Sequence, residues 1–151
     1  MGSSISFAKL DMDTDGKLTG REKFPIVGNR ISLSVAEQIQ KEFAGLFSHW
    51  DCLDKAKIVT KHIRDSQIVV GSLNLASSDM TSLYGHEFHP PYEFHAWVMD
   101  GPFIIDMALP GVIQKGLTTF DSIGAFLVGR EPVILAGTPE PWMMYKGVCI
   151  L

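Results

Sequence analysis

The sequence predicts a single α+β domain in which N-terminal helices pack on an antiparallel sheet. Apolar residues recur at helical spacing in the first half of the chain, stretches rich in β-branched residues follow, and an Asp-Gly pair indicates a hairpin. Helices first and antiparallel strands afterwards are typical of the α+β class. With 151 residues, of which 46% are apolar and 20% charged, the chain has the size and composition of one domain with a buried core.

Charge, apolar runs and cysteine count narrow the expected partners and compartment. The net charge of −4 gives no basic surface, so nucleic acid is not an expected partner. No apolar run approaches the roughly 18 residues of a membrane span, and the N-terminus lacks the pattern of a secretory signal. The two cysteines, Cys52 and Cys149, are too few for a disulfide framework, which favours the cytoplasm; delivery as an effector or toxin is the alternative. None of these features indicates the oligomeric state.

Two helices are expected before residue 65. Ser34 opens the first, residues 34–47, with Glu37 three positions later, which is a capping-box pattern. Asp51 is a good N-cap for the second, residues 51–64. The apolar stripe of the second helix consists of Cys52, Ala56, Val59 and Ile63.

Strands are expected in the second half of the chain, with a polar loop among them. Residues 67–75 are rich in β-branched residues and predict a strand, whereas residues 76–92 are polar and contain prolines, which predicts a surface loop. Asp100-Gly101 is expected to join one strand on each side. The later expectations are a short helix at residues 118–129 and strands at residues 132–137 and 142–151.

The expected hairpin places a histidine beside an aspartate. If Asp100 and Gly101 are the two loop residues, His95 lies directly opposite Asp106, with Cβ atoms roughly 4.5–5.5 Å apart. An aspartate that binds an imidazole fixes its tautomer and stabilises the imidazolium that forms when it takes a proton. The alternative is a core histidine whose ring is satisfied by a neighbour.

Cys52 is the residue that such a pair would deprotonate. It lies in the first turn of an expected helix, where the free N–H groups and the helix dipole favour a thiolate. Asp51 and Asp54 oppose this effect, and a small buried residue on the helix stripe is the structural alternative. Cys149, in an apolar terminal strand, is expected to belong to the core, where a thiol is inert.

The stretches "HWDCLDKAKIVTKHIRDSQIVVGSLNL" and "FHAWVMDGPFIIDMAL" resemble the transglutaminase-like branch of the papain-like cysteine enzymes, over residues 48–110. The resemblance implies a papain-like/transglutaminase-like core over residues 31–151, behind an N-terminal segment. It makes Cys52 the nucleophile, His95 the base and Asp106 the acid that orients the base. The chain departs from the family pattern in "SHWDC", where a Gly often precedes the Cys, and after Asp106, where a Pro often follows.

The implied activity is covalent acyl transfer on amide bonds of a protein or peptide substrate, as in a protease, a deamidase or a transglutaminase. This chemistry requires no cofactor. The oxyanion is expected to bind the backbone N–H of Cys52 and a second donor, for which Trp50 and Gln40 are the candidates. An inactive binding module with the same fold remains the alternative.

A separate pattern, "DMDTDGKLTGRE" at residues 11–22, resembles a calcium-binding loop of the EF-hand type. Its ligand positions are occupied by Asp11, Asp13, Asp15, Lys17 through its carbonyl, and Glu22. Ca²⁺ is therefore the one metal cofactor that this segment predicts. The alternative is a β-hairpin that turns at Asp15-Gly16 with solvated acidic side chains.

"GHEFHPPYEFH" suggests a second metal site. His86, His89 and His95 could bind zinc together with Cys52. A loop that borders the active site and shapes the entry of substrate is the commoner explanation of this pattern.

Overall fold

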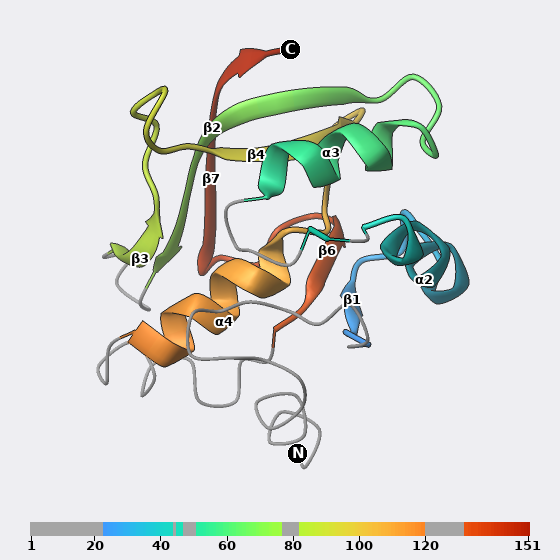
Figure 1. Ribbon diagram of the computed structural model, residues 1–151, viewed down its shortest axis with the longest axis horizontal. Helices are drawn as coiled ribbons and strands as arrows, with labels where there is room; N and C mark the ends of the chain where they lie inside the picture. Colours follow the sequence, from blue (N-terminus) through green and yellow to red (C-terminus); the bar gives the residue numbers. More distant parts are fainter. Residues whose placement is uncertain (1–22, 44, 47–50, 77–81, 120–131) are drawn as a thin grey trace.

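The computed structural model describes residues 23–43, 45–46, 51–76, 82–119 and 132–151, and these residues form a mixed α+β fold (Figure 1). The mixed class agrees with the prediction. Within this part of the chain, no helix is long and apolar enough to cross a membrane. In chain order, the elements are β1 (Ile26–Val27), α2 (Leu33–Lys41), α3 (Cys52–Thr60), β2 (Gln67–Ala76), β3 (Ser82–His86), β4 (His95–Asp100), β5 (Phe103–Asp106), α4 (Leu109–Thr119), β6 (Ile134–Gly137) and β7 (Met143–Ile150).

The sheet has seven strands, and β2 pairs with three of them, β3, β4 and β7. The order is β1-β6-β5-β4-β2-β3, and β7 also pairs with β2. Val69 of β2 pairs with both Trp97 of β4 and Ile150 of β7, so β4 and β7 lie on opposite edges of β2. Strand β3 follows β4 along the same edge, next to Leu73. All pairings are antiparallel except β1 with β6, which is parallel, so the expectation of a purely antiparallel sheet was wrong in this respect.

The two faces of the sheet carry different helices. Helix α3 packs on the face that presents Val70, Ala96 and Val98, together with the buried side chains of α2. The opposite face presents Trp97 and a second group of buried apolar side chains, against which α4 packs. Because side chains alternate along a strand, His95 projects to the same side of β4 as Trp97.

Both early helices form, with boundaries that differ from the expected ones. Helix α2 is capped by Ser32, whose Oγ accepts a hydrogen bond from the Val35 N–H at 3.2 Å. Ser34, the expected cap, lies inside the helix instead. Helix α3 begins at Cys52, directly after Asp51, as the sequence predicted, although the Asp51 side chain makes no capping hydrogen bond.

In the second half of the chain, one expectation was wrong and one helix was not predicted. Residues 76–92 are not only a loop, because residues 82–86 form β3 and pair with β2. Helix α4 occupies residues 109–119, for most of which the sequence analysis made no prediction; Pro110 costs little in its first turn because the missing N–H would be unpaired there anyway. The expected helix at residues 118–129 lies outside the described residues except for the end of α4.

The hairpin of β4 and β5 forms with a register different from the predicted one. Asp100 pairs with Phe103 and Val98 with Ile105, so the two loop residues are Gly101 and Pro102. Gly101 has φ +61°, which suits the first loop position of a type II′ turn, and Pro102 supplies the negative φ of the second. The register therefore moves by two residues, which leaves every side chain on its predicted face.

Candidate active site

Cys52 lies at the point where α3 meets the start of β4. As the first residue of α3, it is 2% exposed and packs into the core between the helix and the sheet. Its Sγ lies 3.8 Å from the carbonyl oxygen of Phe94, the residue that precedes β4. The start of α3 therefore places the thiol beside the backbone that carries His95.

His95 and Asp106 form a buried hydrogen-bonded pair. His95 Nε2 lies 2.7 Å from Asp106 Oδ2, and the two side chains are 0% and 1% exposed. The predicted pairing of these residues is present, but they are not directly opposite each other as expected. In the observed register they are diagonal neighbours on one face, at the point where the ladder between β4 and β5 ends at Val98 and Ile105.

The other ring nitrogen of His95, Nδ1, is not the one that Asp106 holds. Nδ1 is buried and makes no hydrogen bond of good geometry among the described residues. Cys52 nevertheless acts on the ring as a hydrogen-bonding and electrostatic neighbour that favours the charged form of His95. Because Asp106 occupies Nε2, Nδ1 is the nitrogen that remains for proton exchange with Cys52.

The charges in the site stabilise an imidazolium beside a carboxylate. Burial lowers the pKa of His95, but the charge and hydrogen bond of Asp106, with a smaller contribution from Cys52, raise it to about 10. Burial likewise raises the pKa of Asp106, yet His95 and the hydrogen bonds from Tyr145 and the Ala108 N–H leave it lowered. These contacts therefore favour the charged form of His95 at neutral pH in the folded protein.

Tyr145, in β7, is a member of this network that the sequence analysis missed. Its hydroxyl donates to Asp106 Oδ2 at 2.7 Å, and the backbone N–H of Ala108 donates to Oδ1 at 2.9 Å. Burial and the charge of Asp106 raise the pKa of Tyr145 well above its usual value, so the hydroxyl keeps its proton. Tyr145 was visible only as part of an expected strand; which strand it would pair with is decided by the sheet.

Three aromatic rings surround the imidazole of His95. The ring centroids of His86, Trp97 and Tyr145 lie 5.8, 5.9 and 6.2 Å from that of His95, and Trp97 is nearly parallel to it. His86 reaches this position because β3 pairs with β2 beside Leu73. The face of a tryptophan attracts cations, so Trp97, stacked on His95, also favours the imidazolium.

The space around Cys52 is closed. A gap whose lining includes Cys52, Ala96, Trp97 and Asp106 is too small to admit a water molecule. The nucleophile candidate is therefore next to its partners, without room for a substrate carbonyl in this conformation.

The other predicted site residues are elsewhere or outside the described part of the chain. Gln40 lies in α2 and is not among the residues that border the gap at Cys52. Trp50 and the calcium-loop ligands Asp11, Asp13, Asp15, Lys17 and Glu22 lie outside the described residues.

The structure does not support the zinc hypothesis. Among the described residues, no group of three or more His, Cys, Asp or Glu side chains is arranged to hold a metal ion. His86 and His95 are buried, whereas His89 is exposed.

Cys149 is exposed, and the prediction that it belongs to the core was wrong, because β7 is an edge strand whose last residues face solvent.

Comparison with known proteins gives no further guide to the site. No family model, curated protein or solved structure matches this chain. The resemblance to the transglutaminase-like enzymes therefore rests on the residues quoted from the sequence.

Proposed function

We propose that this protein is a cysteine-dependent acyl-transfer enzyme that acts on amide bonds of a protein or peptide substrate. The proposal rests chiefly on one observation: Asp106 holds the ring of His95 through Nε2, and Cys52 is close enough to the same ring to raise the pKa of His95. These residues come from α3, β4 and β5. The alternative, a core histidine satisfied by Asp106 alone, does not explain why a thiol also lies beside the ring. A helix that begins at Cys52 and packs on the sheet that carries His95 and Asp106 is also what a papain-like core requires.

In the proposed reaction, the Cys52 thiolate attacks the carbonyl carbon and forms a C–S bond. His95, charged at neutral pH because of Asp106, donates the Nδ1 proton to the leaving amine as the C–N bond breaks. Water or another amine then attacks the thioester, gives its proton back to His95 and releases the acyl group. The backbone N–H of Cys52, at the start of α3, is the candidate to bind the oxyanion, because the Asp51 side chain does not cap this end.

The exposed Cys149 provides an internal reference for a test of this chemistry. At pH 6 an ordinary thiol is only about 0.3% thiolate, so it alkylates slowly. We expect iodoacetamide to modify Cys52 at least tenfold faster than Cys149 at pH 6, as measured by mass spectrometry of the two peptides. His95→Ala should remove this difference, whereas His89→Ala, at an exposed histidine, should preserve it. Equal rates for the two wild-type cysteines at every pH would contradict a thiolate–imidazolium pair.

The reaction itself can be followed in a mixture of glutamine-containing peptides. Release of ammonia without incorporation of an amine would identify a deamidase, release of ammonia with incorporation of a primary amine a transglutaminase, and new amino termini a protease. Cys52→Ala and His95→Ala should abolish whichever product forms, while circular dichroism shows that both variants remain folded. Retention of the wild-type rate in Cys52→Ala would exclude the proposed nucleophile.

The closed gap at Cys52 favours a second candidate, an inactive binding module with the same core. A cysteine and histidine that are 2% and 0% exposed cannot meet a substrate without some opening of the site. A module of this kind should leave Cys52 less reactive than Cys149 at every pH and should form no product. The alkylation experiment therefore separates the two candidates.

A further inference from the structure

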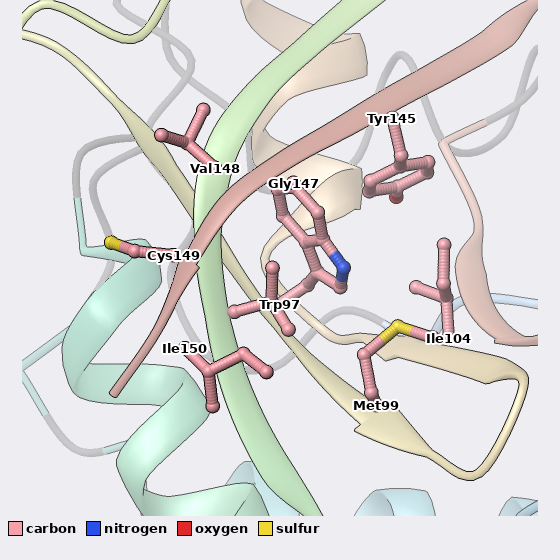
Figure 2. Close-up of a pocket in the computed structure, with 9 residues that line it drawn as sticks. Trp97, Met99, Ile104, Tyr145, Gly147, Val148, Cys149 and Ile150 are labelled. Carbon is pink, nitrogen blue, oxygen red and sulfur yellow. The ribbon is translucent and has the colours of Figure 1, made fainter.

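An apolar groove lies on the sheet beside the candidate active site (Figure 2). It has a volume of about 460 Å³, within the range of ligand sites, and side chains of β2, β4, β5 and β7 line it. Figure 2 shows the side chains of Trp97, Met99, Ile104, Tyr145 and Ile150 on one side of β7, whereas those of Val148 and Cys149 point to the other side.

The groove shares two of its side chains with the site. Trp97 lines the groove, is nearly parallel to the ring of His95, and also borders the gap at Cys52. Tyr145 lines the groove with its ring and donates its hydroxyl to Asp106. A ligand in the groove would therefore contact two side chains that hold the His95–Asp106 pair.

Strand β7 offers the groove a backbone edge for a ligand. It pairs with β2 along one edge, and no strand in the described part of the chain pairs with the other. Its residues from Lys146 to Ile150 are exposed. Gly147 has no side chain, and a Cβ there would lie 2.9 Å from Val69 Cγ1 and 3.7 Å from the Trp97 ring. A side chain at this position would therefore fill part of the groove, and glycine leaves that space free for a ligand beside β7.

We propose that an extended peptide binds along the free edge of β7 and inserts one apolar side chain over Gly147 into the groove against Trp97. Free strand edges bind peptides through main-chain hydrogen bonds, while an adjacent pocket selects alternate side chains. The apolar walls select against a charged side chain, and the backbone of β7 selects for a ligand with amides of its own. Naming this peptide as the substrate rests on the acyl-transfer function proposed above, but its binding does not.

The test measures binding to the full chain carrying Cys52→Ala, which lacks the proposed nucleophile and so cannot form an acyl intermediate with the ligand. The probe is the blocked peptide acetyl-Thr-Val-Leu-Val-Thr-amide, and its matched control has Asp in place of Leu. We expect the Leu peptide to shift the NMR signals of the β7 amides and of the Trp97 indole, and to bind at least tenfold more tightly than the Asp peptide. Equal affinity for the two peptides, or no binding at millimolar concentration, would overturn the proposal.

Two variants at similarly exposed residues test the position of the ligand. Ile150→Trp places a large ring at the groove and should weaken binding of the Leu peptide at least tenfold. Leu33→Trp, in α2 and not among the residues that line the groove, should change it less than twofold. If both variants weaken binding equally, the peptide does not use the groove.

Two further outcomes would show a different occupant. Hexanoate has an apolar chain but no amides, so equal binding of hexanoate would exclude pairing with β7. A dimer in sedimentation experiments, with the β7 amides protected before any peptide is added, would show that a second copy of the chain occupies the edge. Binding of the Leu peptide without any catalytic product would leave this proposal intact and contradict only the acyl-transfer function.

Discussion

At the scale of single residues, the surroundings of His95 explain the electrostatics of the site. A fully buried imidazole would ordinarily be neutral, because burial disfavours its charge. Asp106 at 2.7 Å reverses that preference and raises the pKa of His95 to about 10. The carboxylate in turn depends on its donors, Tyr145 and the Ala108 N–H, which hold it as an anion in the core.

The hydroxyl of Tyr145 should therefore matter more for stability than that of a nearby tyrosine. Tyr145→Phe removes a donor to a buried carboxylate, and hydrogen bonds to charged groups contribute about 1.5–3 kcal/mol, so we expect a loss of unfolding free energy of that size. The matched control is Tyr84→Phe in β3, whose ring packs against His86 instead. Urea denaturation at pH 7 measures both, and equal losses would contradict the role given to Tyr145.

At the scale of elements, the ends of one helix and two strands place the reactive side chains. Helix α3 starts at Cys52, β4 starts at His95 and β5 ends at Asp106, so all three side chains lie at the ends of elements. Gly71 of β2, which pairs with His95, allows β7 to approach, because a Cβ there would lie 2.0 Å from the Lys146 carbonyl oxygen. That approach brings Tyr145 within reach of Asp106.

The N-cap of α2 gives a direct test of an element boundary. Ser32→Ala removes the hydroxyl that accepts from the Val35 N–H and should lower the unfolding free energy by about 1 kcal/mol. Ser34→Ala, two residues later and inside the helix, should cost clearly less, although its hydroxyl lies 3.3 Å from that of Ser32. Thermal or urea unfolding of the two variants compares the costs, and a larger loss for Ser34→Ala would move the cap to that residue.

At the scale of the whole molecule, the buried pair makes stability depend on pH. The pKa of His95 is about 10 in the folded protein and about 6.5 when the chain is unfolded, so between these values the folded state binds the extra proton. The stabilisation is complete below pH 6.5 and is lost as the pH rises towards 10. Asp106, whose pKa is lowered from 3.8, contributes stability above that pH and loses it in stronger acid.

We therefore expect the unfolding free energy to fall steadily from pH 6.5 to pH 10. Asp106→Asn removes the charge that raises the pKa of His95, leaving burial to lower it, so this variant should lack the alkaline decline. Urea unfolding at several pH values measures the slopes for both proteins. An equal slope in Asp106→Asn would assign the decline to other groups.

The sequence by itself determined the α+β class, the helix that begins at Cys52, and the presence of His95 and Asp106 on one face of a hairpin. These follow from local rules: helical periodicity, strand composition, and the period of two that keeps both side chains on one face despite a register shift of two residues. Ser32 as the cap, strand β3 and helix α4 were missed, because each depends on which of several acceptable local structures packs better.

Only the tertiary structure decided which distant residues meet. Pairing of β7 and β3 with β2 brings Tyr145 and His86 to His95, and it leaves Cys149 exposed on the edge strand. The physical reason is that pairing between strands depends on the packing of whole faces, and single residues carry no signal for the strand they will join.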